Sequence, residues 1–307
     1  MFYKFSIIII LSMTFFIFAQ DKVDDTKVMD HGSNQVEWII YETEGPAVCF
    51  AVSRSHLWFS NGNSVGNYDL RSRHKKMLPT LGDIPSSSIK SIAVDSRGNV
   101  WFGGNNGVIV LQKNKFKLFT KGDGLSDNNV TIIRYASGSV WVGTKKGISE
   151  YKNNRWVEYN SYNGVCGDDI RDITHDGRGT VYFATNNGIA VYEGGLWTAF
   201  DRSNGTSSND VKALGYDPRK DELWAAMGKS DVDRYNGKEW NNFMDIQENI
   251  EFTTTDTQSR IWFGSLNGIL KYNGYEWVTN PEKIGFQPAQ VTEMYRDSKG
   301  DLFFAIE

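Results

Sequence analysis

Short stretches in which apolar and polar residues alternate follow one another along most of the chain, bounded by turn-forming Gly, Asn and Asp. Within these stretches an aliphatic residue directly followed by an aromatic one recurs every 38 to 43 residues. The seven aromatic residues of these pairs are Trp58, Trp101, Trp141, Tyr182, Trp224, Trp262 and Phe303. Self-similarity at a period of this length indicates a repeat architecture.

Each unit contains four segments that we expect to be β-strands. The first is apolar, as in residues 130–134, and ends in a turn of the form Asp-x-x-Gly, in which Asp and Gly suit the first and fourth positions. The second segment holds the aromatic anchor, and in four units a glycine follows six residues later, where a tight hairpin needs a positive φ. The fourth segment carries aromatic residues three apart, as Trp156 and Tyr159 do.

Four short antiparallel strands in about 40 to 45 residues make one blade of a β-propeller. We therefore predict an all-β fold, a seven-bladed β-propeller of four-stranded antiparallel blades. An immunoglobulin-type sandwich would not repeat one phrase seven times. The repeated tryptophans keep a fixed register, so we expect them to pack between neighbouring blades rather than to bind a ligand. They are Trp101, Trp141, Trp224 and Trp262 in the second segments and Trp156, Trp197, Trp240 and Trp277 in the fourth segments.

The two ends of the sequence suggest how the ring closes. The last unit stops at Glu307 after its first two segments. Near the start, Trp38 and Tyr41 reproduce the spacing of a fourth strand, and residues 26–30 are a weaker candidate for a third strand. Because a ring must close to remove its edge strands, we expect these N-terminal strands to complete the last blade. The alternative is that the chain is a fragment of a larger sensor whose continuation supplies the missing strands.

Residues 1–19 have the pattern of a secretory signal peptide. Lys4 precedes an apolar run from Phe5 to Phe18, and the small residue Ala19 comes before polar sequence. The apolar run is shorter than the roughly 20 residues that span a bilayer as a helix, so a retained anchor is the less favoured reading. We expect residues 20–307 to form a single propeller domain that is periplasmic or secreted, with no membrane span in the mature chain.

Charge and the reactive residue types narrow the function classes. The chain has 33 basic and 37 acidic residues and no long basic run, which argues against a nucleic acid partner. Cys49 and Cys166 fall in different units, so we expect both to be free and partly buried. The four histidines, His31, His56, His74 and His175, lack metal-ligand spacing. We predict no catalytic residues, no metal and no cofactor.

The phrase from Gly122 to Tyr151, GDGLSDNNVTIIRYASGSVWVGTKKGISEY, resembles the two-component regulator propeller repeat. Shorter matches cover about six units, with departures such as Tyr182 and Phe303 in place of Trp. The resemblance implies a periplasmic sensor β-propeller of the kind found in hybrid two-component systems, which often recognise carbohydrate breakdown products. It implies no kinase activity, since no kinase segment is present.

We expect a ligand to meet the face of the ring where the loops between blades and the hairpins between second and third strands emerge together. Amides, short acids and a few cations on this face suit a polyhydroxylated or peptide ligand. Asn, Asp and Gly also populate such turns for backbone reasons alone, which is the alternative for any single residue. Tyr162 lies outside the repeated register. The candidate residues are Asn106, Asp127, Asn128, Lys145, Lys146, Tyr162, Asp169, Asn187, Lys229 and Asn267.

The function that these observations favour is non-catalytic binding, as a sensor, of a polar ligand such as an oligosaccharide. One alternative is a scaffold for protein–protein interaction in a cell-surface or secretion assembly, with an envelope protein as partner. A less favoured alternative is an enzyme similar to streptogramin lyase, a seven-bladed propeller that needs histidines and a glutamate on late blades. This chain has no histidine after His175.

Overall fold

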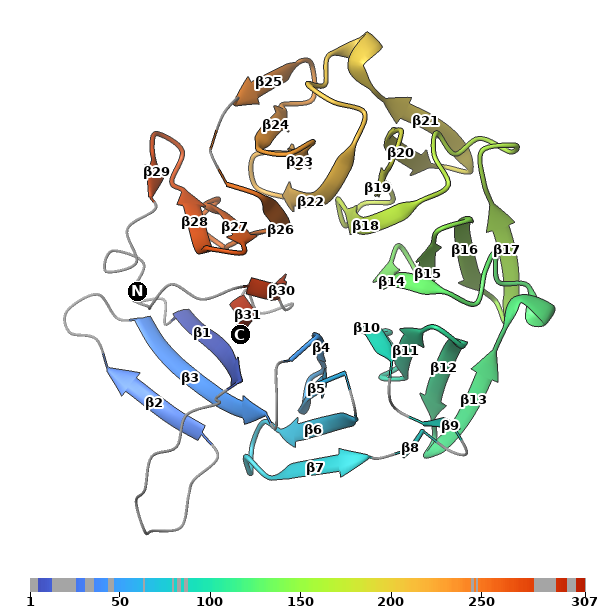
Figure 1. Cartoon of the computed structure of the whole chain (residues 1–307), viewed down its shortest axis with the longest axis vertical. Coiled ribbons are helices and arrows are strands. Elements are labelled where there is room, and N and C mark those ends of the chain that lie inside the picture. The colour runs from blue at the N-terminus through green and yellow to red at the C-terminus, as the bar shows by residue number, and fades with distance from the viewer. Residues whose placement is uncertain are drawn as a thin grey trace.

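The computed structural model arranges the chain as a ring of radial β-sheets, as Figure 1 shows. It describes residues 5–12, 26–30, 36–43, 47–62, 64–78, 80–81, 84–85, 88–243, 246, 248–278, 291–296 and 302–306. Six sheets have four strands in sequential antiparallel order, and a seventh sheet combines strands from both ends of the chain. The predicted seven-bladed propeller is confirmed.

We number the blades along the chain. Blade 1 is β4 (Cys49–Val52), β5 (His56–Ser60), β6 (Val65–Asp69) and β7 (Lys75–Leu78). Blade 2 is β10 (Ile89–Val94), β11 (Val100–Gly104), β12 (Gly107–Gln112) and β13 (Lys115–Phe119). Blade 3 is β14 (Val130–Ala136), β15 (Ser139–Thr144), β16 (Gly147–Lys152) and β17 (Arg155–Tyr159). Blade 4 is β18 (Ile170–His175), β19 (Val181–Thr185), β20 (Gly188–Glu193) and β21 (Leu196–Phe200).

Blade 5 is β22 (Val211–Asp217), β23 (Glu222–Met227), β24 (Asp231–Tyr235) and β25 (Trp240–Phe243). Blade 6 is β26 (Ile250–Thr255), β27 (Ile261–Ser265), β28 (Gly268–Tyr272) and β29 (Trp277–Val278). Blade 7 contains β30 (Val291–Arg296) and β31 (Leu302–Ile306). A short hairpin of β8 (Thr80–Leu81) and β9 (Ile84–Pro85) links blades 1 and 2, and the 3-10 helices η1 (Lys121–Asp123) and η2 (Arg202–Asn204) lie in the loops that enter blades 3 and 5.

The repeated tryptophans pack between blades, as expected. The second-strand residues Trp101, Trp141, Trp224 and Trp262 are at most 3% exposed. Trp141 illustrates the contact, because its ring in blade 3 meets Phe183 of blade 4 edge to face at a centroid distance of 5.2 Å. The fourth-strand tryptophans are half-buried and pack against the hydrophobic clusters. Aromatic pairs of this geometry add to the stability that burial supplies, so the anchor stabilises the packing of neighbouring blades.

The turn between the first and second strands is tied to the tryptophan anchor. In blade 2, Asp95 accepts hydrogen bonds from the backbone N–H of Arg97 and Asn99 at 2.9 Å, and from Nε1 of Trp101 at 3.1 Å. Asp256 accepts from Trp262 Nε1 in the same way at 2.9 Å in blade 6. In blades 2 and 6 the Asp of this turn therefore has a packing role as well as a backbone role.

The seventh blade closes the ring with N-terminal strands, but in an order that the sequence did not predict. From the centre outwards its strands are β30, β31, β1 (Phe5–Ser12), β3 (Val36–Thr43) and β2 (Thr26–Asp30). The fourth-strand prediction for β3 is confirmed, and Tyr41 is buried with Tyr68 and Phe303. The third-strand prediction for residues 26–30 is wrong, because β1 occupies that place and β2 lies outermost.

Strand β1 differs from every third strand of blades 1 to 6. It runs parallel to both β31 and β3, whereas the other six blades are fully antiparallel. Its residues fall within the predicted signal peptide, whose cleavage stays a prediction. Among the residues that the structure describes, no helix is long and apolar enough to cross a membrane.

Candidate functional site

The hairpins between second and third strands meet the loops between blades on one face, as expected. The backbone N–H of Gly107 donates to the carbonyl of Asn128 at 2.8 Å, and Gly188 N donates to Asn209 O at 2.6 Å. A Cβ on Gly107 would lie 2.2 Å from the carbonyl oxygen of Phe119, and its φ is +104°, so only glycine fits. We call this surface the loop face.

Several candidate residues on the loop face build its turns. The side chain of Asn128 accepts from the backbone N–H of Lys121 at 2.6 Å, which fastens the loop that enters blade 3. Asn187 Nδ2 donates to the Cys166 carbonyl at 2.8 Å, and Asn267 Nδ2 donates to Glu248 at 3.0 Å. These amides are therefore engaged within the protein, in line with the turn-making alternative.

Three further candidates take part in ion pairs. Lys146 Nζ lies 2.7 Å from Asp127 Oδ2, and this bond, with a second one from Asn129 N, lowers the pKa of Asp127. Asp169 Oδ2 lies 3.4 Å from Arg171 Nε. Asp127 is thus held ionised beside a cation that is itself 67% exposed and able to turn towards a ligand.

Four candidates are exposed and have no side-chain hydrogen bond or ion pair with any described residue. Tyr162 is 96% exposed in the loop before blade 4. Asn106, Lys145 and Lys229 occupy the hairpin tips of blades 2, 3 and 5. The structure therefore does not gather the ten candidates into one cluster, but distributes them around the loop face.

The inner strands supply residues that the sequence analysis missed. In blades 2 to 7 the register of the first strand shifts at its second residue, which leaves one extra residue without a partner in the ladder. Such a β-bulge redirects a side chain and is frequent near functional sites. The extra residues are Lys90, Thr131, Arg171, Lys212, Glu251 and Thr292, and Val48 takes the corresponding place before β4. We call these seven residues the mouth ring.

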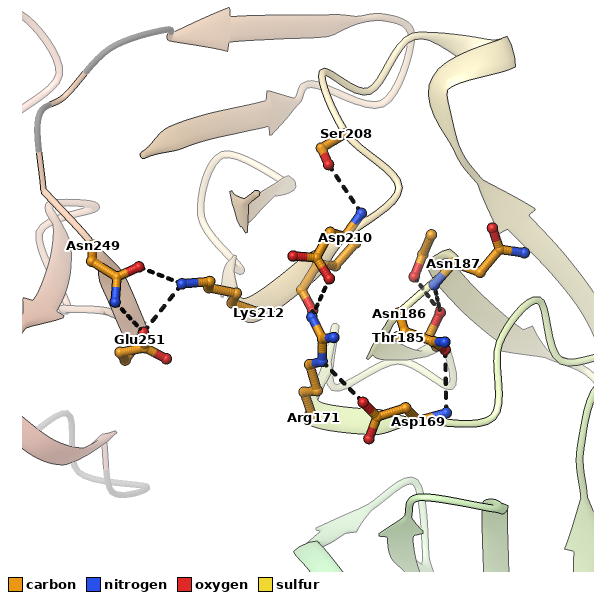
Figure 2. Close-up of polar contacts among 12 residues, drawn as sticks. Asp169, Arg171, Thr185, Asn186, Asn187, Ser208, Asp210, Lys212, Asn249 and Glu251 are labelled. Carbon is orange, nitrogen blue, oxygen red and sulfur yellow. Dashed lines mark hydrogen bonds and ion pairs between the residues drawn. The ribbon is translucent and has the colours of Figure 1, made fainter. Parts of the chain in front are cut away.

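The mouth ring forms polar contacts from one blade to the next, as Figure 2 shows for blades 4 to 6. Arg171 Nη1 lies 2.5 Å from Asp210 Oδ1, and Lys212 Nζ contacts Asn249 and, at 3.2 Å, Glu251 Oε1. In blade 2, Lys90 Nζ donates to Asn129 Oδ1 at 2.9 Å. All of these groups are partly exposed, so a ligand at the mouth can exchange with them.

Below the mouth, the channel has a volume of about 620 Å³ and is lined by the inner strands. Arg134 on β14 lies 3.2 Å from Glu293 Oε1 on β30 and 3.9 Å from Asp172 Oδ1 on β18. Its side chain is 21% exposed, and those of the two acids are 11% and 16% exposed. Three blades thus contribute to one charged cluster, which carries two carboxylates against one guanidinium.

Burial and mutual charge set the protonation of this cluster. Burial raises the pKa of Glu293 to about 7, despite the opposing charge of Arg134. Burial also raises the pKa of Asp172, against the same opposition. Burial alone lowers the pKa of Arg134, but the two carboxylates outweigh it and the net shift is upward. The cation is permanent, and Glu293 is the group that titrates near neutral pH.

Cys49 and Cys166 are free thiols, and His175 lines the channel. Both cysteines are free, as predicted, although Cys49 is fully buried rather than partly buried. Burial raises the pKa of the Cys49 thiol well above its ordinary value, which disfavours the reactive thiolate. Burial lowers the pKa of His175 at the end of β18. Among the described residues, no three His, Cys, Asp or Glu side chains are grouped so as to hold a metal ion.

A sequence signal for the inner-strand residues did exist. The second residue of the first strand is polar or charged in six units, within segments that are otherwise largely apolar. Arg134 likewise ends the apolar run from Val130. A polar residue at a fixed place in a buried strand marks a side chain that leaves the core, and this signal identifies six of the seven residues of the mouth ring.

Comparison with known proteins places the chain among propellers. Residues 83–106 match the family model described as two component regulator propeller. Among curated proteins, no sequence matches the chain. The extracellular domain of a hybrid two component system from B. thetaiotaomicron superposes with a TM-score of 0.68 at 18% identity over 86% of this chain. The extracellular domain of a one component system from the same organism superposes with a TM-score of 0.60 at 20% identity over 90% of this chain. The chain spans 38% of each of those two proteins.

A propeller enzyme is similar as well. Virginiamycin B lyase from Staphylococcus aureus superposes with a TM-score of 0.67 at 19% identity, over 86% of this chain and 92% of the enzyme. Identities this low establish a shared fold and leave function to the residues of the site.

Proposed function

We propose that this chain, which carries a repeat of the two component regulator propeller family, is a non-catalytic sensor propeller that binds a polar ligand such as an oligosaccharide at the mouth ring. The observation that carries the proposal is the composition of that ring. Core positions repeat from blade to blade, whereas the bulged position holds Lys, Thr, Arg, Lys, Glu and Thr in turn. Different side chains at a fixed position of a repeated scaffold are what a binding surface requires.

The chemistry of the mouth suits a ligand with many hydroxyl groups. Ammonium and guanidinium groups donate, carboxylates accept, and the Asn129 and Asn249 amides do both. The channel below has a volume in the range of small-molecule sites. The similarity to extracellular domains of two component systems supports a sensor role and a place outside the cytoplasm, reached through the signal peptide of residues 1–19.

Thermal denaturation in the presence of single compounds tests the proposal. A panel of oligosaccharides and peptidoglycan fragments is added to the chain, and a ligand that binds only the folded protein raises Tm. The double variant R171A/K212A should lose the response, because it removes two cations of the mouth ring. K238A, an exposed lysine in the outer turn of blade 5, is the matched control and should retain it. Failure of every polar compound to raise Tm, or an equal response of R171A/K212A, would contradict the proposal.

A further inference from the structure

A groove separate from the channel runs along the outer junction of blades 2 and 3. Its volume is about 1090 Å³, and its walls come from the two facing sheets. It extends from the turn at Asp95 to Asn99, on the side opposite to the loop face, up to Asp123 in the loop that enters blade 3. The five-residue strand β17 beside it is about 16 Å long at the usual rise per residue, so the groove offers room for an extended segment.

Four aromatic rings form the floor of the groove. Trp101 and Phe119 of blade 2 are at most 5% exposed, and Tyr151 and Trp156 of blade 3 are half-buried. Tyr151 lies 4.8 Å from Trp156 and 5.1 Å from Trp101 between ring centroids. Trp156 meets Trp101 edge to face at 87°. The half-buried Tyr151 and Trp156 therefore present the accessible apolar surface of the floor, and the buried Trp101 and Phe119 support them from below.

The walls carry an excess of positive charge. Arg97, Lys117, Lys152 and Arg155 line the groove against only two acids, Asp95 and Asp123. The channel, by contrast, is lined by four basic and four acidic side chains, Lys90, Arg134, Arg171 and Arg296 against Asp172, Asp176, Glu251 and Glu293. The groove is thus a local positive surface on a chain whose formal net charge is −4.

The two acids of the groove are already engaged. Asp95 accepts from two backbone N–H groups, from the Asn99 amide at 2.8 Å and from the Trp101 indole. Asp123 accepts from the backbone N–H and hydroxyl of Thr120, which lowers its pKa. Asp95 is thus satisfied within its own turn, whereas the exposed Asp123 also interacts with the charge of Lys117, and the groove keeps an excess of two basic side chains.

The cations, in contrast, are available. Within the part of the chain that the structure describes, no acceptor oxygen is bonded to the side chains of Arg97, Lys117 or Arg155, all of which are exposed. Lys117 Nζ rests over the Phe119 ring at 4.4 Å, and Lys152 lies 4.0 Å from Glu150. The turn of blade 4 shows the contrast, because Arg178, which corresponds to Arg97, bonds to Asp221 and to the Tyr216 hydroxyl.

We propose that the groove between blades 2 and 3 binds an extended acidic peptide segment of a partner protein. Apolar side chains of the peptide pack on the aromatic floor, and its carboxylates pair with Arg97, Lys117 and Arg155. Side-chain amides of Asn99, Gln112 and Asn153 line the groove and can both donate to and accept from peptide groups. Arginine, tyrosine and tryptophan are the residue types that dominate binding energy at protein interfaces. This site is independent of the mouth ring.

A peptide array tests the proposal. The full chain is applied to ten-residue peptides that carry none to five acidic residues among apolar ones, and selected peptides are then titrated by fluorescence anisotropy. Acidic peptides should be retained, and the affinity should fall as salt is raised, because exposed charges are screened. The double variant R97E/R155E should bind the selected peptides at least about tenfold more weakly. K238E reverses a cation in the turn between the third and fourth strands of blade 5, away from the groove. This variant should bind the peptides like the wild type.

The variants are expected to fold, since the two arginine side chains contact no acceptor, and a melting curve verifies this. If R97E/R155E nonetheless unfolds, the milder variant K117Q/R155Q provides the comparison. The proposal is overturned if acidic peptides are not enriched, or if the folded groove variant binds them like the wild type. It is also overturned if trigalacturonate binds, R97E/R155E weakens that binding, and no acidic peptide binds. The groove would then be a site for acidic sugars.

Discussion

Nη2 of Arg134 in blade 3 donates a hydrogen bond of 3.2 Å to Oε1 of Glu293 in blade 7, on a non-adjacent blade of the ring. Asp172 of blade 4 faces the same guanidinium at 3.9 Å. The contact therefore spans the channel instead of joining neighbouring sheets. It couples the first strand of the closing blade to the middle of the chain.

Replacement of Arg134 by Met should destabilise the fold strongly. R134M leaves Glu293 and Asp172 buried without their cation, and loss of one partner of a buried ion pair costs about 3–5 kcal/mol. The free energy of unfolding from urea titration measures the effect. R134M/E293Q should recover part of the loss, because one uncompensated carboxylate is removed. A wild-type stability for R134M would show that the cluster is solvated rather than buried.

Protonation of Glu293 should make stability depend on pH. Its pKa is raised from 4.5 to about 7 in the folded chain, so the folded state binds this proton more tightly than the unfolded state. The contribution of Glu293 therefore favours folding below about pH 4.5 and is lost as the pH rises towards 7, with a limit of about 3 kcal/mol. His175 acts in the opposite direction, because its lowered pKa disfavours the folded state in acid.

The difference between wild type and E293Q removes the His175 contribution, which both proteins share, and leaves that of Glu293 with its coupling to Asp172. Urea titrations of both proteins between pH 4 and pH 8 supply the curves. The wild type should lose stability relative to E293Q as the pH rises through this window. A constant difference across the window would contradict a raised pKa.

Gly124 should tolerate alanine less well than Gly138. Both have positive φ, +113° and +82°, which costs about 1 kcal/mol for a residue with a Cβ. A Cβ on Gly124 would also lie 2.9 Å from Cβ of Trp156, whereas nothing lies within 4 Å of one on Gly138. We expect G124A to lower the free energy of unfolding by at least about 1 kcal/mol more than G138A. Equal losses would mean that Trp156 shifts freely.

The polarity of the closing blade leads to a prediction about the chain without its leader. Strand β2 runs antiparallel to β3, which is parallel to β31, so β2 has the direction of a third strand. A chain that begins at Gln20 lacks β1 and leaves the place between β31 and β3 open. We expect β2 to move into this place and complete an antiparallel blade like the other six.

Amide hydrogen exchange followed by NMR can test this strand replacement. As the outermost strand, β2 is paired on one side only, so every second amide is unprotected. Between β31 and β3 it is paired on both sides. In the chain that comprises residues 20–307, every amide of residues 26–30 should therefore be protected from exchange. Unchanged alternate protection would show that β2 stays outermost. The full-length chain is the control.

The sequence predicts the parts of this fold that repeat and misses those that occur once. Seven anchors, their hairpin glycines and the packing of Trp141 follow from period and turn chemistry, because each copy meets the same neighbours. The order of the closing blade depends on competition between β1 and β2 for one place, which no local pattern encodes. The Arg134–Glu293 contact joins residues 159 positions apart, and only the assembled ring brings them together.

The bulges of the inner strands separate architecture from recognition. A bulged residue has no partner across the ladder, so a change of its side chain leaves strand register and hairpins untouched. Six such positions, with Val48 as a seventh, can be varied while the hydrogen-bond ladders of the blades stay the same. The propeller is therefore a suitable scaffold for engineered binding proteins. New specificities can be selected from a library in which only the codons of these positions are varied.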